Sequence, residues 1–298
     1  MRVFVTGSTG FIGSAIINEL LAAGHQVLGL ARNDAAGDAL ARLGVEAHRG
    51  DLLDTQSLAA GARACDGVIH TAFIHDFSNF KASCEIDRSA IEALGAALVG
   101  SDHPLIVTSG TALVKPGQLA TEEDVPAFDS IVFPRIASEE AAASVAARGV
   151  RVSVVRLSPS VHGDGDHGFV PIVIGIAREK GVSAYVGDGH NRWSAVHRLD
   201  AAALFRLALE KATAGARFHG VAEEGIAFQD IAQVIGRRLN IPVVAKSPEE
   251  AADHFGWFAH FAALDCPASS AQTRERLGWR PTQPGLIPDL NRARYFET

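Results

Sequence analysis

The sequence is poor in the residues that mark secreted, disulfide-stabilised or metal-binding proteins. It has only three cysteines, Cys65, Cys84 and Cys266, and their wide spacing forms neither a CxxC pair nor another metal-ligand pattern. We expect each thiol to behave as a small buried hydrophobe. The sequence therefore predicts no metal site and favours a reducing, cytoplasmic setting.

Long apolar runs and blocks of basic charge are also missing. No apolar stretch of about 18 residues occurs, so no membrane span is expected, and the short apolar start is not a signal peptide. The formal net charge of −7, without any basic run, argues against nucleic acid as a partner. With 298 residues, 47% of them hydrophobic, the chain can form one large domain or two unequal ones around a sizeable core. The expected partner is a small-molecule substrate.

The chain does contain, at its start, a strand-like segment, a glycine turn and a helix in direct succession. Residues 2–5 are mostly apolar, and Gly7, Gly10 and Gly13 follow them. In such a unit the first glycine makes a tight turn, the second admits a pyrophosphate, and the third lets the helix lie close to the strand. The N-terminus of the helix then offers free N–H groups to the anion. This pattern predicts dinucleotide binding; the alternative is a helix-starting turn without a ligand.

Strands and helices alternate through the first half of the chain. The expected strands are 3–5, 26–31, 45–48, 67–71, 105–108 and 152–156. The expected helices are 11–23, 35–43, 58–64, 80–98 and 135–147. A repeated strand–helix order predicts an α/β fold with a doubly wound parallel sheet covered by helices on both faces. Strands with consecutive apolar residues, such as 105–108, fit burial on both faces.

The pattern changes near Leu157, where a Gly-, Pro-, His- and Asp-rich stretch, 158–168, is expected to form loops. Further helices are expected at 170–178, 201–210, 228–239, 249–254 and 270–277, and further strands at 217–221 and 243–246. A short segment, 183–187, follows the first of these helices. We predict a dinucleotide-binding domain of residues 1–157 and a smaller α/β substrate-binding part of residues 158–298. Some elements near 195–225 are expected to return to the first domain.

The end of the second expected strand indicates which dinucleotide would bind. An acidic residue there would hold the ribose 2′-hydroxyl of NAD, but the chain has Arg32, whose guanidinium suits the 2′-phosphate of NADP. NADP is therefore favoured over NAD. Arg32 could instead be a solvated surface residue, and Asp34 could pair with it or bind a ribose. After the third strand, Asp51 and Leu52 would meet the adenine edge, or Asp51 would cap the following helix.

Five segments together resemble the extended short-chain dehydrogenase/reductases, a family that includes epimerases, dehydratases and dihydroflavonol-type reductases. The segments are 6–13 (TGSTGFIG), 50–52 (GDL), 68–72 (VIHTA), 196–200 (VHRLD) and 277–281 (LGWRP), so the resemblance spans nearly the whole chain. It implies a Rossmann fold and an NAD(P)-binding oxidoreductase. The residues implied to hold the cofactor are Gly7, Thr9, Gly10, Phe11, Ile12, Gly13, Arg32, Asp51, Leu52, Thr71 and Ala72.

The chain departs from that family's catalytic pattern. Family members use a Ser or Thr to polarise the substrate oxygen, and a Tyr with a Lys four residues later to move the proton. The corresponding places hold Arg135 and Glu139, and neither of the two tyrosines, Tyr185 and Tyr295, is followed by such a lysine. The chain is therefore identified as an atypical member, and the family's mechanism does not carry over whole.

Four residues are candidates for the altered catalytic site. Arg135 would stabilise a developing alkoxide or clamp an anionic substrate, and Glu139 would accept bonds from ribose hydroxyls. The two are four residues apart and predicted to share a helix face, so an ordinary ion pair is the alternative. Ser109 and Thr111 would bind a carbonyl oxygen or the nicotinamide ribose, or would bond to the backbone at the strand end.

Three further residues are candidates for substrate contact. His75, in the loop after the fourth strand, would supply a proton, or would be an exposed loop histidine. His162 lies in a loop that, in the resembled family, passes the nicotinamide. Trp193 would form a wall of the substrate pocket or pack at the surface. His70 and His197 lie in segments that look like buried strands and are expected to be structural.

These observations favour an NADPH-dependent reduction of a small carbonyl compound. A non-catalytic NADP-binding sensor and an isomerase or lyase that uses bound dinucleotide are the alternatives. The apolar faces of helices 80–98 and 135–147 would form the interface of a homodimer or would belong to the core of the protein.

Overall fold

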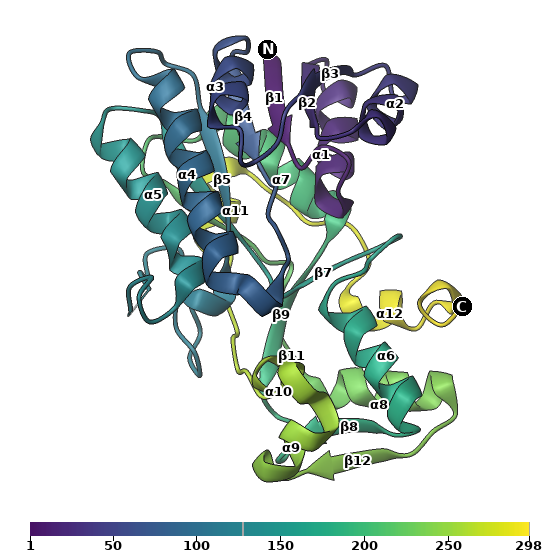
Figure 1. The fold of residues 1–298 in the computed structure, drawn as a ribbon. Coiled ribbons are helices and arrows are strands. Elements are labelled where there is room, and N and C mark those ends of the chain that lie inside the picture. The colour runs from purple at the N-terminus through teal and green to yellow at the C-terminus, as the bar shows by residue number, and fades with distance from the viewer. Residues whose placement is uncertain (127, 298) are drawn as a thin grey trace.

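A computed structural model describes residues 1–126 and 128–297. Its main body is a seven-stranded sheet in the order β10-β6-β5-β4-β1-β2-β3, and every neighbouring pair runs parallel (Figure 1). The strands are β1 (Arg2–Thr6), β2 (Gln26–Ala31), β3 (Glu46–Arg49), β4 (Gly67–His70), β5 (Leu105–Gly110), β6 (Val152–Leu157) and β10 (Arg217–Gly220). The order reverses between β1 and β4, and open α/β sheets bind ligands at such a switch point. The predicted α/β doubly wound fold is confirmed.

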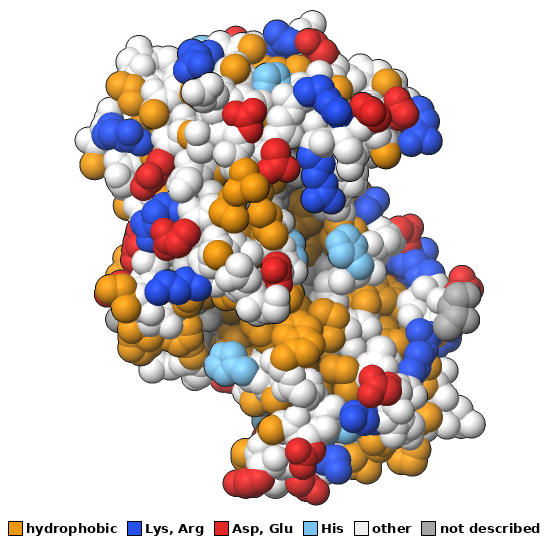
Figure 2. All heavy atoms as spheres, in the orientation of Figure 1, with side chains coloured by type: hydrophobic (Ala, Val, Ile, Leu, Met, Phe, Trp, Pro, Cys, Tyr) orange, Lys and Arg blue, Asp and Glu red, His pale blue; other side chains and the backbone are white. Residues whose placement is uncertain are grey.

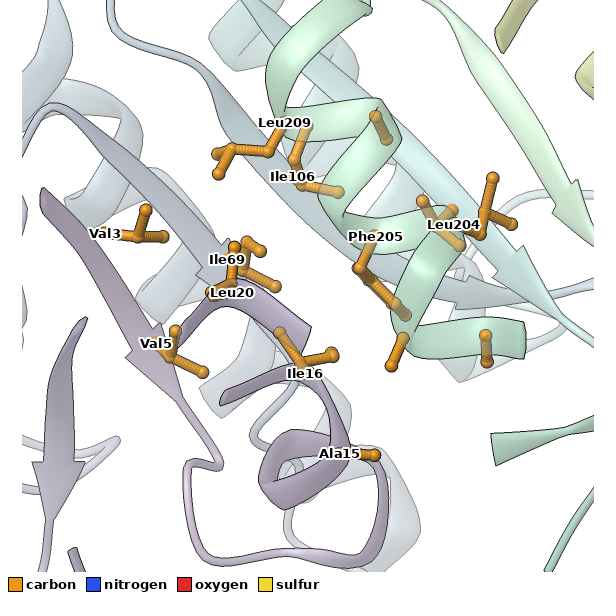
Figure 3. Close-up of a cluster of buried hydrophobic side chains, with 14 of the residues drawn as sticks. Val3, Val5, Ala15, Ile16, Leu20, Ile69, Ile106, Leu204, Phe205 and Leu209 are labelled. Carbon is orange, nitrogen blue, oxygen red and sulfur yellow. The ribbon is translucent and has the colours of Figure 1, made fainter. Parts of the chain in front are cut away.

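Helices cover both faces of this sheet because successive strand residues point to opposite sides. Val3, Val5, Ile69 and Ile106 belong to one buried cluster. Phe4, which lies between Val3 and Val5 in β1, belongs to another on the opposite face of the sheet. The first cluster includes side chains of α1 (Phe11–Ala22), α2 (Asp34–Arg42) and α7 (Arg198–Lys211). The second includes those of α3 (Thr55–Arg63), α4 (Phe80–Leu98) and α5 (Ala137–Ala147). Figure 3 shows Ile16 and Leu20 of α1 facing Phe205 of α7 across the first cluster.

A second, smaller lobe lies beyond the carboxyl ends of the strands (Figure 1). It combines a three-stranded sheet in the order β11-β9-β7 with the parallel pair β12 and β8. The strands are β7 (Ser160–His162), β8 (Ser183–Val186), β9 (Arg192–His197), β11 (Glu223–Ala227) and β12 (Val243–Lys246). Its helices are α6 (Phe169–Lys180), α8 (Phe228–Leu239), α9 (Pro248–Phe255), α10 (Ala259–Ala262) and α12 (Leu286–Leu290). Helix α11 (Ala271–Leu277) packs instead against α7 and β10 of the main body. A third buried cluster, rich in aromatic side chains, forms most of the core of the smaller lobe.

The structure corrects the sequence-based expectations mainly in the second half. The bounds predicted for β2, α4, α8 and β12 match those observed. Residues 158–168 are not all loop, because β7 pairs with β9 there, and neither β7 nor β11 was expected. The helix expected over 135–147 begins instead with a 3-10 turn, η3 (Pro134–Ile136). Within the described ranges, no helix combines the length and apolar character that crossing a bilayer requires.

Candidate active site

The glycine turn between β1 and α1 has a geometry that demands glycine at two positions. Gly7 adopts φ +68°, which L side chains rarely adopt. A Cβ on Gly13 would lie 2.0 Å from the carbonyl oxygen of Gly7, so the helix can approach the turn only without a side chain there. The Gly10 N–H donates to the same carbonyl at 2.9 Å, and the Ser8 hydroxyl donates to the Leu30 carbonyl at 2.7 Å. The turn is thus a rigid platform anchored to β1 and β2.

The N-terminus of α1 has the features of an anion-binding site. No side chain caps the helix at Gly10, and its first turn holds no acidic residue. Thr9 and Gly10 are exposed, while Phe11 and Ile12 are half-buried. Free N–H groups at a helix N-terminus together with the positive end of its dipole suit a phosphate. These residues therefore fit the diphosphate of a dinucleotide.

Two basic side chains from the second half of the chain lie beside this helix N-terminus, and sequence reasoning assigned neither to the cofactor. The Arg198 guanidinium lies 5.2 Å from the centre of the Phe11 ring. The ring centres of His167 and Phe11 are 5.7 Å apart. Arg198 is the first residue of α7, whose N-terminus lies at the same edge of the sheet as that of α1 (Figure 1).

At the far end of the predicted cofactor site, Arg32 is exposed just beyond β2. Asp34 does not pair with it, because its carboxylate lies 3.2 Å from the guanidinium of Arg49. Asn33 caps α2 by accepting from the N–H of Ala36 at 2.9 Å. The nearest carboxylate in sequence, that of Asp34, is therefore paired with Arg49 and not with Arg32.

The segment after β3 corrects one interpretation of Asp51. Its carboxylate accepts from the Leu53 N–H at 3.0 Å, within the loop. The cap of α3 is Asp54, which accepts from the Ser57 N–H at 3.0 Å. Asp51 is thus not the helix cap that the sequence suggested as the alternative, because α3 begins at Thr55 and Asp54 directly precedes it. It is exposed, next to buried Leu52.

A chain of buried hydrogen bonds fixes the end of β4 against β1. Thr71 donates through its hydroxyl to the carbonyl of Thr6 at 2.7 Å, and the N–H of Ala72 lies 3.3 Å from the Thr6 hydroxyl. That hydroxyl also bonds Nδ1 of His70 at 2.8 Å, and Nε2 of His70 bonds Asp87 on α4 at 2.9 Å. Thr71 and Ala72 therefore lie on a framework that adjoins the glycine turn.

Arg135 lies in η3, at the carboxyl end of β5. Its guanidinium is 3.1 Å from the Asp87 carboxylate and donates to the Thr108 carbonyl at 3.2 Å. It also bonds the Ser138 hydroxyl and lies 4.4 Å from the centre of the Phe73 ring. Its side chain is 18% exposed.

Asp87 balances this cation from a fully buried position. Burial alone would raise the pKa of Asp87, but the hydrogen bond to His70 and the charge of Arg135 hold that pKa below its usual value. The carboxylate is therefore ionised at neutral pH. It fixes where the Arg135 guanidinium points.

Glu139, on the first turn of α5, is bound to a different partner. Its carboxylate accepts from Nε and Nη2 of Arg156 at 2.8 and 2.7 Å and from the Ser109 hydroxyl at 2.7 Å. The Arg156 side chain is fully buried. Burial would raise the pKa of Glu139, but the bonds and charge of Arg156 lower it below the usual value. Most of the acceptor capacity of Glu139 is thus used within the protein.

The prediction that Arg135 and Glu139 share a helix face or pair with each other is wrong. The chain makes a 3-10 turn at Arg135 and becomes α-helical only at Ala137, so the two side chains turn toward different neighbours. Arg135 reaches Asp87 on α4, and Glu139 reaches Arg156 on β6.

The other predicted oxygen-binding residue is also engaged. Thr111 is buried, and its hydroxyl lies 3.4 Å from the Leu157 carbonyl and 3.3 Å from the Ser194 hydroxyl. This is the strand-end backbone bonding left open as the alternative for Thr111. Ser109, by contrast, bonds a side chain, that of Glu139.

His75 lies at the open side of this site. The side chain is exposed, and its ring centre is 5.1 Å from that of Phe73, the same ring that Arg135 covers. Although the residue is exposed, neighbouring protein atoms remove part of the water around the ring, and this desolvation and the nearby charge of Arg135 lower the pKa of His75. Of the three predicted substrate contacts, only His75 is exposed.

His162 and Trp193 lie elsewhere. His162 is fully buried, with Nδ1 bonded to Asp289 at 2.9 Å. Trp193 is also fully buried, in the core of the second lobe, with its ring centre 4.9 Å from that of Phe228. Its indole N–H donates to the Phe261 carbonyl. Trp193 is therefore a core residue, neither a pocket wall nor a surface residue, and His162 is held away from any ligand by its burial.

Sequence reasoning missed the two buried charges that hold the site together, although a signal for each was present. Asp87 occupies the buried face of α4 that it shares with Cys84, Ile91 and Leu94, a face on which a carboxylate needs a partner. Arg156 interrupts the apolar strand β6 in the same way. A charge in an otherwise apolar pattern indicates a buried ion pair, but it does not name the partner.

Comparison with known proteins agrees with this architecture. Residues 3–221 match the model of a family described as the NAD dependent epimerase/dehydratase family. The chain is 51% identical over 298 residues to an uncharacterized protein of Schizosaccharomyces pombe, covering 99% of this chain and 100% of the relative. It is 30% identical over 234 residues to a 2-alkyl-3-oxoalkanoate reductase of Stenotrophomonas maltophilia, covering 74% of this chain and 69% of that one.

Solved structures show the same fold. A dTDP-glucose 4,6-dehydratase from Streptomyces venezuelae, solved with NAD and TYD bound, has a TM-score of 0.80 and 20% identity, covering 99% of this chain and 97% of that one. At this identity the likeness establishes the fold alone.

Proposed function

The chain belongs to the NAD dependent epimerase/dehydratase family, and from that premise we propose that it is an NADPH-dependent oxidoreductase that reduces a small carbonyl compound. The observation that carries the proposal is Arg135, an arginine with a partly exposed side chain whose guanidinium is fixed by buried Asp87 at the carboxyl end of β5. Substrates of open α/β sheets bind at this edge. The similarity to a 2-alkyl-3-oxoalkanoate reductase supports the reduction of a carbonyl.

The cofactor would be held along the switch point of the sheet. The uncapped N-terminus of α1 would bind the diphosphate, with Arg198 and His167 beside it. Arg32 would bind the 2′-phosphate of NADP through its planar fork of N–H donors. Thr71 and Ala72, anchored to Thr6, would line the path toward the nicotinamide.

When bound, the nicotinamide would supply the hydride that reduces the carbonyl carbon. Arg135 donates a hydrogen bond to the carbonyl oxygen and stabilises the negative charge that develops there. It cannot supply the proton, because a guanidinium stays protonated near neutral pH. A water at the open side of the site delivers the proton that completes the alcohol, or the protonated fraction of His75 does so, a fraction that grows as the pH falls because the pKa of His75 is lowered. Glu139 and Ser109, bonded to each other, position the ends of β5 and α5.

Replacing Arg135 by alanine is expected to lower kcat about 100-fold, because one preorganised donor to the developing charge is lost. Arg135→Lys keeps the charge but loses the planar fork of N–H donors, so its kcat should lie between that of the native protein and that of Arg135→Ala. NADPH oxidation is followed with a panel of ketones and aldehydes, and NADPH affinity and Tm are measured for each variant. Unchanged kcat in a folded Arg135→Ala protein would show that Arg135 does not contact the reacting oxygen.

The same assay separates the alternative functions. Tight NADPH binding without turnover of any carbonyl favours a sensor of dinucleotide state. Product formed without net change in the cofactor favours an isomerase or lyase. Only NADPH consumption matched by alcohol formation supports the reductase.

Replacing Arg32 by alanine is expected to weaken NADPH binding about tenfold or more and to leave NADH binding nearly unchanged, because one charge-assisted contact to the 2′-phosphate is lost. Calorimetry with both cofactors measures the preference. Arg42→Ala, an exposed arginine in the last turn of α2, is the matched control and should change neither affinity. An unaltered NADPH preference in Arg32→Ala would remove Arg32 from the cofactor site.

A further inference from the structure

An aromatic wall joins the two lobes at the open side of the candidate site. The wall consists of Phe73, Phe77, Phe80, Trp257 and Phe261. Phe77 and Trp257 are stacked, with ring centres 4.9 Å apart and planes 28° apart, and Phe77 also meets Phe261 edge-on at 6.3 Å. Phe77 belongs to the segment after β4, and Trp257 and Phe261 belong to the second lobe. The rings therefore bridge the two parts of the chain.

Two members of the wall are open to solvent. Trp257 is 55% exposed and Phe77 is 38% exposed, whereas the other two tryptophans, Trp193 and Trp279, are fully buried. Figure 2 shows the surface hollowed between the two lobes, with hydrophobic side chains gathered around the hollow. Contiguous exposed apolar surface next to a site commonly marks where an apolar ligand binds.

The wall is continuous with the proposed catalytic group. Phe77 stacks on Phe80 at 5.7 Å, and Phe80 meets Phe73 at 6.1 Å. The Phe73 ring in turn lies 4.4 Å from the Arg135 guanidinium. A molecule whose oxygen contacts Arg135 would therefore place the rest of its body against aromatic rings.

We infer that the substrate is a hydrophobic ketone or aldehyde whose alkyl or aryl portion lies on the aromatic wall while its oxygen contacts Arg135. The inference rests on the proposed carbonyl reduction and names its substrate class. Aromatic rings stabilise hydrocarbon by removing it from water. They provide few partners for sugar hydroxyls and diphosphates, which would lose their hydrogen bonds to water. A nucleotide sugar is thus a poor match for this surface.

The test is binding, measured apart from turnover. Because Trp257 is the exposed tryptophan, quenching of intrinsic fluorescence by acrylamide reports on it, and a ligand on the wall should protect it. The protein with saturating NADP⁺ is titrated with 2-butanone, 2-hexanone, 2-octanone and acetophenone, and with UDP-glucose and dTDP-glucose. We expect affinity for the ketones to rise about threefold with each added methylene, and the nucleotide sugars to give no protection.

Variants assign the effect to the wall. Phe77→Ala should weaken binding of 2-octanone about tenfold while changing that of 2-butanone little. Trp257→Ala should have the same effect on both affinities. Its affinities are measured by calorimetry, because this variant lacks the fluorescent side chain that reports binding. Val99→Ala, which trims an exposed apolar residue just after α4, should change neither affinity.

The outcomes separate this inference from the proposed function. Affinity that does not depend on chain length, or nucleotide sugars that protect Trp257 better than ketones, would overturn the substrate class. Wall variants that lower Tm but leave ketone affinity unchanged would overturn it as well, because the rings would then only hold the lobes together. Chain-length-dependent binding without NADPH oxidation would support the apolar site and refute the reductase.

Discussion

Replacing Gly13 by alanine is expected to destabilise the protein by about 1–3 kcal/mol and to weaken dinucleotide binding about tenfold or more. The new Cβ would lie 2.0 Å from the carbonyl oxygen and 2.8 Å from the carbonyl carbon of Gly7. Both atoms belong to backbone, so relief requires α1 to move away from the turn. That movement displaces the N–H groups that would meet the diphosphate. Urea unfolding measures the stability, and calorimetry with NADPH measures the affinity.

The matched control is Gly37→Ala, the same change inside the neighbouring helix α2. There a Cβ would meet only the Ala47 side chain, at 4.0 Å. Alanine is the better helix former, so Gly37→Ala should stabilise the protein by about 0.5–1 kcal/mol without changing cofactor affinity. If Gly13→Ala also gained stability and bound NADPH as the native protein does, the close approach of α1 to the turn would not be needed for binding.

The first half of the fold could be predicted because its signals are local. The glycine turn at residues 7–13 and the alternation of apolar strands with amphipathic helices are readable in short windows, and right-handed crossovers then fix the topology. The second lobe could be predicted less well. Strands β7, β9 and β11 are held by pairings between segments distant in the chain, and Ser160–His162 carries no apolar alternation that would announce a strand.

The candidate site could be predicted only as a set of residues, without their partners. Sequence spacing suggested that Arg135 would meet Glu139, whereas each side chain is held by a charge that a different element supplies. Asp87 comes from α4 and Arg156 from β6, and only the packing of α5 against both brings them together. The aromatic wall, likewise, joins segments around Phe77 and Trp257 that lie far apart in the chain. Long-range packing of this kind leaves no local signature.

The two buried ion pairs on either side of α5 have different consequences for the site. The pair of Arg135 and Asp87 leaves the Arg135 side chain partly exposed, so it can act on a ligand. The pair of Arg156 and Glu139 is almost wholly enclosed, with 0% and 9% of the side chains exposed, so it can act only by holding β5, β6 and α5 together. If the proposed function holds, stability and reactivity around α5 are carried by separate pairs.

Replacing Arg156 by methionine is expected to destabilise the protein by about 3–5 kcal/mol at pH 7, because Glu139 would be left as an unpaired buried carboxylate. In the native protein the lowered pKa of Glu139 means that its stabilisation is complete above its usual value of 4.5 and is lost as the pH falls through the native pKa. In the variant, burial without a partner raises that pKa, so protonation relieves the penalty on acidification. The difference between variant and native protein should therefore shrink from pH 7 to pH 5, as urea unfolding at each pH would show.

The double variant Arg156→Met, Glu139→Leu decides whether the unpaired charge is the cause. Replacing both partners of a buried pair by apolar residues is often nearly neutral, so most of the lost stability should return. The stability difference from the native protein should then no longer change between pH 7 and pH 5. Arg42→Met, at an exposed site, controls for the substitution itself and should change stability by less than about 0.5 kcal/mol. A double variant as unstable as Arg156→Met alone would mean that Arg156 acts through its other contacts, the Asp124 carbonyl at 2.8 Å and His219 at 3.4 Å, and not through Glu139.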